Sequence, residues 1–183
     1  MYSLIIDTAT NLMYLCLYKD ENCFFEYKGL YNKNHSSYLV HNINNLLTTN
    51  NLSIKNIKEI IVGSGPGSYT GIRVAGVVAK TLCYTLNIPL YKISSLALLS
   101  SSFDSCIASI DARNNAYFAY IKNLLPDGYY TKDYLLNTYP NYPVIELNFE
   151  TSKIDIVKII NTKERIINIH SYEPNYVNKV KVG

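Results

Sequence analysis

The amino-acid sequence predicts an α/β fold built from two related units, and three observations carry that prediction. Short β-rich runs alternate with amphipathic helical patterns along residues 1–100. A glycine-rich loop, residues 63–71, joins an apolar run to a helical pattern. An apolar run that ends in Asp occurs twice, as Ile6-Asp7 and as Ile110-Asp111, so a second unit echoes the first.

The chain opens with a predicted antiparallel meander. Residues 3–6 form an apolar strand that ends at Asp7-Thr8-Ala9-Thr10, and residues 13–18 and 22–27 are further β-rich runs. A helix follows to about Thr49, with Ser36-Ser37 as its N-cap and an apolar face at helical spacing made of Leu39, Ile43, Leu46 and Leu47. The other face carries Asn and Thr in place of Lys and Glu, which indicates a covered surface.

The glycine-rich loop connects a strand, residues 59–62, to a helix, residues 71–86, with Thr70 as the predicted N-cap. The loop lacks the Gly-Lys-Ser/Thr of a P-loop and the spacing of Gly-x-Gly-x-x-Gly. Two functions stay open: binding an anion at the helix N-terminus, or letting neighbouring elements pack closely. The candidate anion or nucleotide contacts are Asp7, Gly65, Gly67, Ser68, Thr70 and Arg73.

Arg73 is the sharpest of these candidates. A cation in the first helical turn opposes the helix dipole, so we expect a carboxylate or phosphate partner for it. The helix that it begins carries apolar residues on more than one side, with Ala75, Gly76 and Ala79 between them. Periodicity leaves two interpretations open, a central core helix or a helix with one face on the sheet and one on a partner.

Two domains are predicted, residues 1–102 and a smaller, degenerate second lobe at residues 103–183. In the first, a strand at residues 90–93 and a short helix capped by Ser94-Ser95 complete the order β-β-β-α-β-α-β-α. In the second, residues 106–111, 116–121, 143–147 and 166–169 read as strands, Pro126-Asp127-Gly128 as a turn, and residues 154–160 as a helix.

The amino-acid composition excludes several classes of protein. The chain has 183 residues, of which 48% are hydrophobic and 17% charged, with a net charge of +3, values typical of a globular domain. No basic arm indicates autonomous nucleic-acid binding. The first residues lack the cationic region of a signal peptide, and no apolar run reaches membrane-spanning length. We therefore expect a cytoplasmic protein without a membrane anchor.

The remaining reactive side chains predict neither a metal site nor a catalytic residue. His35 and His41 are six residues apart, which is not the i, i+4 spacing of a helical metal site. No Ser or Cys lies in a nucleophile elbow. Four cysteines without CxxC spacing lie in apolar segments, so we expect buried free thiols in a reducing compartment: Cys16, Cys23, Cys83 and Cys106.

Five motifs in this order resemble the TsaB (YeaZ) family, the dimerisation subunit of the bacterial tRNA threonylcarbamoyladenosine machinery. They are Ile5-Ile6-Asp7-Thr8-Ala9-Thr10, His35-Ser36, the stretch from Gly63 to Arg73 with Gly65-Pro66-Gly67-Ser68-Tyr69-Thr70-Gly71, Ser94-Ser95-Leu96, and Ile110-Asp111-Ala112-Arg113. The resemblance implies an actin-like (ASKHA) fold of two RNase-H-like lobes, with mixed sheets, packed helices and a shortened second lobe.

The resemblance also implies a non-catalytic scaffold subunit. It would pair with TsaD, which transfers the threonylcarbamoyl group to adenosine-37 of tRNA, and the ATPase TsaE would dock on the pair, so that contact with tRNA is indirect. ATP or ADP would be held, if at all, at the subunit interface and not by the isolated subunit. The implied interface lies on the first two helices and comprises Leu39, Ile43, Leu46, Ile72, Ala75, Gly76, Ala79 and Cys83.

Two alternatives stay open beside the scaffold role. One is an enzyme acting alone, an actin-like ATPase, a phosphotransferase or a glycopeptidase-like protein that uses Asp7 and Asp111. Asp7-Thr8-Ala9-Thr10 departs from the phosphate loops of nucleotide-binding actin-like proteins because it contains no glycine. The other is a homodimer, in which the same two helices pair with a second copy when TsaD is absent.

Overall fold

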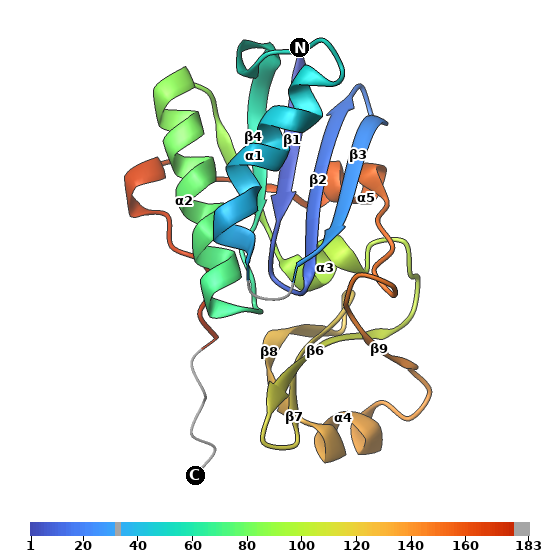
Figure 1. Ribbon diagram of the computed structural model, residues 1–183. Helices are drawn as coiled ribbons and strands as arrows, with labels where there is room; N and C mark the ends of the chain where they lie inside the picture. Colours follow the sequence, from blue (N-terminus) through green and yellow to red (C-terminus); the bar gives the residue numbers. More distant parts are fainter. Residues whose placement is uncertain (32–33, 178–183) are drawn as a thin grey trace.

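In a computed structural model, which describes residues 1–31 and 34–177, the protein consists of two β-sheets with helices around them. The sheets are arranged end to end (Figure 1). Its strands are β1 Tyr2–Asp7, β2 Leu12–Lys19, β3 Asn22–Leu30, β4 Ile57–Gly63, β5 Leu90–Ile93, β6 Ile107–Arg113, β7 Ala116–Ile121, β8 Leu125–Thr131, β9 Val144–Glu146 and β10 Glu164–Arg165. Its helices are α1 His35–Thr48, α2 Tyr69–Leu86, α3 Ser95–Leu99, α4 Lys132–Thr138 and α5 Ile156–Thr162, with short 3₁₀ turns η1 Ile54–Asn56 and η2 Ile169–Ser171.

The first sheet has the strand order β10-β5-β4-β1-β2-β3. β1, β2 and β3 form the predicted antiparallel meander, while β4 and β5 run parallel to β1. β1 and β4 lie at the centre, and each carries a run of three buried apolar residues, 4–6 and 60–62, because helices cover both faces of the sheet. The predicted element order of this unit is confirmed.

The second sheet repeats the first in shorter form, with the order β8-β7-β6-β9. β6, β7 and β8 form an antiparallel meander, and β9 runs parallel to β6 as β4 runs parallel to β1. Each meander is followed by a helix that leads into the parallel strand, α1 in the first unit and α4 in the second (Figure 1). The predicted repeat is therefore present in the topology.

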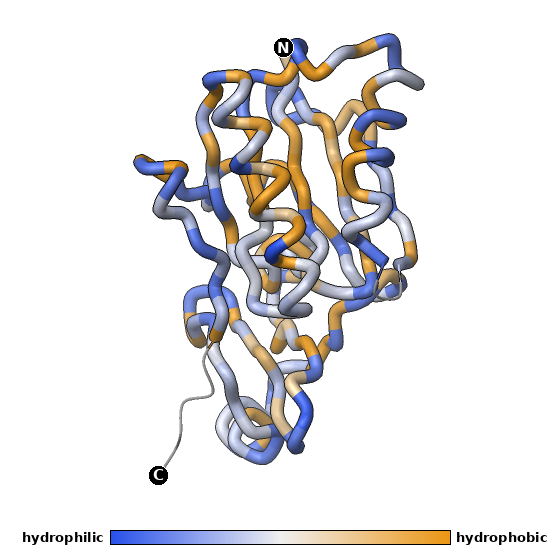
Figure 2. The backbone as a smooth tube through the Cα atoms, turned by 60° about the vertical axis from the view of Figure 1, so that its left-hand side comes forward, coloured by the Kyte–Doolittle hydropathy of each residue, from blue (hydrophilic) through white to orange (hydrophobic). Residues whose placement is uncertain are grey.

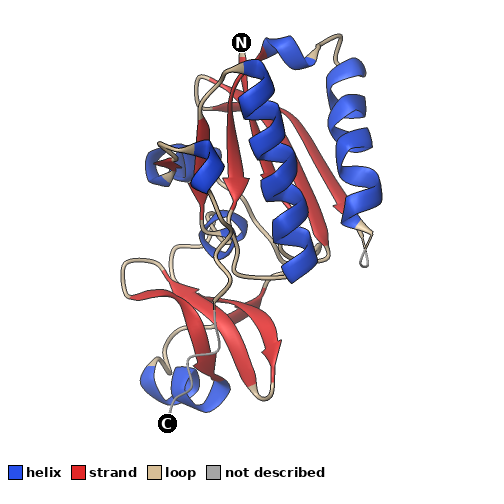
Figure 3. Ribbon diagram, turned by 90° about the vertical axis from the view of Figure 1, so that its left-hand side faces the viewer, coloured by secondary structure: helices blue, strands red, loops and turns tan. Residues whose placement is uncertain are grey.

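Both faces of the first sheet are packed. α1 and α2 lie side by side on one face, and α3 and α5 lie on the other (Figures 1 and 3). β2 shows how alternation serves the two layers: Met13, Leu15 and Leu17 face α1 and α2, whereas Tyr14 and Cys16 face the opposite layer. The central strands are accordingly hydrophobic along most of their length (Figure 2).

Several local predictions were wrong. α1 begins at His35 after Asn34, so Ser36-Ser37 lie inside the helix, and α2 is capped by Ser68 and not by Thr70. Asp127 lies within β8 and not in a turn, and the strand predicted at residues 166–169 is the shorter β10 followed by η2. Helix α4 was not predicted, because the tyrosines at and just before it, Tyr129, Tyr130 and Tyr134, favour a strand.

The chain returns to the first sheet after β9. α5 packs on that sheet, and β10 pairs with β5 at its edge, so residues 156–172 belong with the first sheet. The division into residues 1–102 and 103–183 stays a prediction. Within residues 1–31 and 34–177, no helix combines the length and the apolar character that crossing a bilayer requires.

Candidate functional site

The glycine-rich loop packs directly against the turn that follows β1. A Cβ atom at Gly63 would collide with the Asp7 carboxylate, and Cβ atoms at Gly67 and Gly71 would collide with the backbones of Ala9 and Thr8. Gly65 has a φ of +91°, a conformation that side chains disfavour. The glycines therefore allow close contact between two turns of the same chain, the second of the two functions that the sequence left open.

Asp7 lies at the centre of this contact and is fully buried. One carboxylate oxygen accepts a hydrogen bond from the Ala9 amide at 2.9 Å, and the other accepts one from the Ser95 hydroxyl. Ser95 Oγ in turn accepts the Gly65 amide at 3.0 Å. Burial raises the pKa of Asp7 to about 6, although these two hydrogen bonds lower it. Asp7 thus joins the loop, β1 and α3 from inside the fold.

Several backbone N–H groups that an anion would need already donate hydrogen bonds to acceptors within the chain. The Ser64 amide bonds to Ile93 O at 2.8 Å, and the Ser68 amide bonds to Ala9 O at 2.7 Å. The Ser68 hydroxyl accepts the Gly71 amide as the N-cap of α2. Of the candidate contacts, the structure brings Asp7 and Gly65 together in the interior, while Ser68, Thr70 and Arg73 are exposed.

Arg73 faces two tyrosine rings. Its guanidinium lies 4.2 Å from the ring centre of Tyr69, and its Nε donates to the Tyr176 hydroxyl at 3.1 Å. Among residues 1–31 and 34–177, no carboxylate forms an ion pair with it. The aromatic rings stabilise the cation by cation–π contact, while an anionic partner supplied by a ligand stays a prediction.

A cleft of about 740 Å³ lies between the turns that follow β1 and β6. Gly67 and Ser68 line it from the glycine-rich loop, and Asp111 and Arg113 line it from the second sheet. His35 lines it from the start of α1, where burial lowers the pKa of the imidazole. Asp7 does not line this cleft, so of the two strand-end acids only Asp111 faces it.

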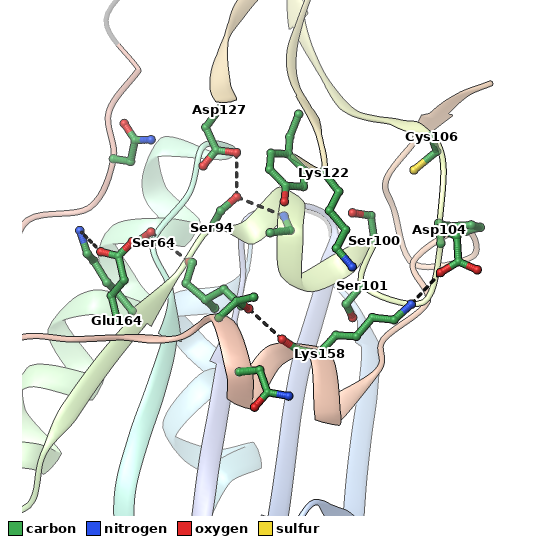
Figure 4. Close-up of a pocket in the computed structure, with 18 of the residues that line it drawn as sticks. Ser64, Ser94, Ser100, Ser101, Asp104, Cys106, Lys122, Asp127, Lys158 and Glu164 are labelled. Carbon is green, nitrogen blue, oxygen red and sulfur yellow. Dashed lines mark hydrogen bonds and ion pairs between the residues drawn. The ribbon is translucent and has the colours of Figure 1, made fainter. Parts of the chain in front are cut away.

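A second cavity, of about 730 Å³, lies on another side of the junction between the sheets (Figure 4). Asp127 reaches it from β8 and accepts a hydrogen bond from Ser94 at 2.8 Å. Burial raises the pKa of Asp127 to about 6. Lys122 enters from the same hairpin as Asp127, and Lys158 enters from α5, where it pairs with Asp104 at 2.9 Å (Figure 4). No sequence pattern indicates this cavity, because its residues come together from distant segments.

The residues predicted to contact a partner face this chain's own core. Seven of them are buried and Leu46 is half-buried, so they cannot form the open surface of the two helices: Leu39, Ile43, Leu46, Ile72, Ala75, Gly76, Ala79 and Cys83. The apolar stripe that was read as an interface is the stripe that each helix uses to pack on the sheet. This corrects the choice of residues, while the choice of helices stays a prediction.

The surface that α1 and α2 leave open is made by other residues, which we call the outer helix face. It comprises Ser36, Ser37, Tyr38, Val40, His41, Asn44, Asn45 and Thr48 of α1, and Tyr69, Thr70, Arg73, Val77, Thr81, Tyr84 and Thr85 of α2. Three apolar or aromatic side chains on this face are largely exposed to solvent: Val40 is 61% exposed, Val77 63% and Tyr84 67%. Arg73 is its only Lys, Arg, Asp or Glu residue.

One flank of α2 is covered by the C-terminal segment, residues 166–177. Tyr172 packs beside Gly76, where a Cβ atom would lie 3.2 Å from its ring. Lys80 Nζ donates to the carbonyl oxygens of His170 and Tyr172 at 3.0 and 3.2 Å. The Asn175 amide donates to Ser64 O at 2.7 Å, so the segment reaches the glycine-rich loop as well.

Metal-ligating side chains are dispersed in the part of the chain that the structure describes. No group of three or more His, Cys, Asp or Glu residues there is close enough to hold a metal ion.

A family model described as "TsaD: tRNA N6-adenosine threonylcarbamoyltransferase" matches residues 28–149, which is more than half of the chain. The chain therefore belongs to this family of actin-like proteins with RNase-H-like lobes. Among its relatives are the proteins called "tRNA threonylcarbamoyladenosine biosynthesis protein TsaB" of Bacillus subtilis, 34% identical over 122 residues, and of Escherichia coli, 31% identical over 121 residues. These relatives agree with the resemblance to the TsaB (YeaZ) family that the motifs carry.

The matches to these two relatives cover 64% and 62% of the chain but 53% and 51% of the relatives, so the chain spans about half of their length. Two solved structures show the fold. YeaZ from Pseudomonas aeruginosa matches with a TM-score of 0.59 and 23% identity, over 70% of this chain and 64% of that one. An uncharacterized protein described as similar to peptidase YeaZ from Pseudomonas aeruginosa matches with a TM-score of 0.76 and 17% identity, over 97% and 99%.

Proposed function

We propose that this chain is a non-catalytic subunit of tRNA threonylcarbamoyladenosine synthesis that pairs with TsaD through the outer helix face. The observation that carries the proposal is the composition of that face. Solvent-facing helix residues are usually Lys, Glu or Asp, yet this face has one charged side chain and exposes Val40, Val77 and Tyr84. Exposed apolar and aromatic groups without acids around them are typical of a docking surface.

The glycine-rich loop supports a scaffold role over an independent enzyme. Asp7, the acid that such an enzyme would use, is fully buried and bonded to Ser95 and Ala9. Much of the loop packs against the chain itself. That arrangement positions the start of α2 rigidly, which is what a helix presented to a partner needs.

The other partners of the proposed role stay predictions. TsaE would bind to the pair of subunits, and tRNA would be contacted through the complex. ATP or ADP at the subunit interface would be sought first in the cleft beside Gly67, Ser68 and Asp111, which is the hollow nearest to the start of α2. The names of the TsaB relatives support the reaction to which the chain contributes.

Substitution of Val77 by Glu tests the docking surface. Val77 is exposed, so the variant should fold, and a carboxylate in the middle of an apolar contact should weaken pairing with TsaD by at least about tenfold. The measurement is the affinity for purified TsaD, together with threonylcarbamoyladenosine formation in a reconstituted system. Ile167→Glu is the matched control, because Ile167 is 90% exposed and lies outside the outer helix face.

The outcomes separate the two parts of the proposal. Loss of pairing in Val77→Glu with normal pairing in Ile167→Glu supports this surface. Equal affinity in all three proteins would show that TsaD binds elsewhere. Absence of any association between the unchanged chain and TsaD, in a system where TsaD is active with another TsaB, would overturn the proposed function.

A further inference from the structure

Cys16 and Cys23 meet across the β2–β3 hairpin. Their Sγ atoms are 3.1 Å apart, within the distance of a thiol–thiol hydrogen bond. The sequence predicted four buried free thiols; all four are free and three are buried, but the prediction of burial was wrong for Cys23. Cys23 is exposed, whereas Cys16 is fully buried beneath it. The two thiols are free in this structure, so the contact is one between two reduced cysteines.

The hairpin explains why two cysteines seven residues apart in the sequence come together. Asp20 and Glu21 both adopt positive φ, at 49° and 65°, and close a tight two-residue turn. The register shifts next to it: Tyr18 lies opposite Cys23, but Leu17 lies opposite Phe25, so one residue of β3 is extra. Cys16 and Tyr18 point to the same face, which makes Cys23 the diagonal neighbour of Cys16.

The two thiols differ in environment. Cys16 packs in the core between the first sheet and α3 and α5, and the hydrogen bond with Cys23 and burial both raise its pKa. The pKa of Cys23 is lowered, first by the hydrogen bond with Cys16 and also by Lys28, against the effects of burial and of Glu26. Cys23 is therefore both the accessible thiol and the one with more thiolate character, the combination that reacts with oxidants.

We propose that Cys16 and Cys23 form a reversible oxidation site that closes to a cross-strand disulfide in the presence of a peroxide. This inference does not rest on the proposed function. The Cys23 thiolate attacks the peroxide, its O–O bond breaks, and Cys23 becomes a sulfenic acid as water leaves after protonation. The Cys16 sulfur then displaces hydroxide from that sulfenic acid, and the thiol proton of Cys16 converts it to a second water. Two thiols are oxidised and one peroxide is reduced to two waters.

Cys83 and Cys106 are internal controls for this chemistry. Cys83 is fully buried in α2, where burial raises its pKa to about 12, and Cys106 is buried between the sheets. In the part of the chain that the structure describes, neither has a cysteine neighbour at hydrogen-bond distance. Accessible thiolate character is confined to the hairpin pair, so we expect oxidation there first.

The test is oxidation of the reduced chain by one equivalent of hydrogen peroxide, followed by alkylation in denaturant and mass spectrometry. We expect the number of alkylated thiols to fall by two. Trypsin cuts after Lys19, between the two cysteines, so the disulfide should link the peptides of residues 1–19 and 20–28. A dithiol reductant should separate them. The double variant Cys83→Ser with Cys106→Ser should form the same linked peptides.

Single variants of the pair make the result decisive. Cys23→Ser is an exposed, conservative change and should abolish the fast oxidation, whereas Cys16→Ala should leave a sulfenic acid on Cys23 that dimedone traps. The proposal would be overturned if the unchanged chain kept all its thiols while a surface cysteine in a reference protein was oxidised. A link that involves Cys83 or Cys106, or one that joins two chains, would overturn it as well.

Discussion

Asp7, an acid at the end of a strand where catalytic acids often lie, has a structural role in this chain. It ends β1 in a motif shared with a family of actin-like proteins, yet its carboxylate bonds to Ser95 and Ala9 and does not line the cleft. Gly63 is required opposite it because any side chain there would collide with the carboxylate. The acid, the serine and the glycine thus form one packed unit that holds β1, β4 and α3 in register.

The raised pKa of Asp7 predicts a pH-dependent stability. The folded chain holds the Asp7 proton to about pH 6, whereas the unfolded chain releases it near 3.8, so the contribution of Asp7 to stability is most favourable below the lower value and falls as pH rises between the two. The shift corresponds to on the order of 3 kcal/mol. We expect Asp7→Asn, which does not titrate, to lack this fall. Chemical denaturation of both proteins across this range measures it, and parallel stability curves would contradict the assignment.

At the scale of elements, a partly buried ion pair ties the end of α5 to the first sheet. Glu59 of β4 accepts from Lys163 at 2.6 Å, from Ser3 at 2.7 Å and from Tyr18 at 2.7 Å. Burial works to raise the pKa of Glu59, but the hydrogen bonds outweigh it and the pKa is lowered. The pair is only 13–14% exposed, so it links the returning part of the chain to three strands.

Removal of Lys163 tests that link. Lys163→Met leaves the charged Glu59 partly buried with only the Ser3 and Tyr18 hydroxyls as partners, and we expect a loss of about 2 kcal/mol in the free energy of unfolding at neutral pH. The loss should shrink as pH falls through the pKa of Glu59, because a protonated Glu59 no longer needs the cation. Lys158→Met is the control: its partner Asp104 is 90% exposed, so the loss should be much smaller. Equal losses would contradict the prediction.

Sequence patterns predicted the elements with strong periodicity and missed those that depend on contacts. The meander, α1, α2 and the repeated strand ending in Asp all follow from local spacing. Helix α4 was missed, since its one tyrosine packs on a residue of another element: Tyr134 stacks on Tyr130 of β8, with ring centres 5.8 Å apart. The interface residues were placed on the wrong face because an apolar stripe shows that a helix is covered, without showing by what. The pairing of Cys16 with Cys23 required the register of the hairpin.

For the whole molecule, the C-terminal segment completes the core of the first sheet. Tyr172 is 6% exposed and belongs to the cluster beneath α2, while its hydroxyl is buried without a hydrogen-bond partner among the described residues. We expect Tyr172→Ala to lower the free energy of unfolding by about 3 kcal/mol or more, through the cavity that it leaves. Tyr172→Phe should be neutral or slightly stabilising, since it removes an unsatisfied polar group. Thermal and urea unfolding distinguish the two, and a large loss in Tyr172→Phe would show a hidden partner for the hydroxyl.

The two connections between the sheets lie side by side. The Ser102 amide donates to Lys153 O at 3.1 Å, the Lys153 amide donates to Leu99 O at 2.9 Å, and the Asp155 amide donates to Ser101 Oγ at 2.7 Å. The second sheet is therefore joined to the first by two connecting segments that are hydrogen-bonded to each other. If the two sheets rotate relative to each other, these two connecting segments must bend. Because both sheets line the cleft and the cavity, the two would then change shape together. A ligand that binds in the cleft would in this way alter the shape of the cavity, and a ligand in the cavity would alter the cleft.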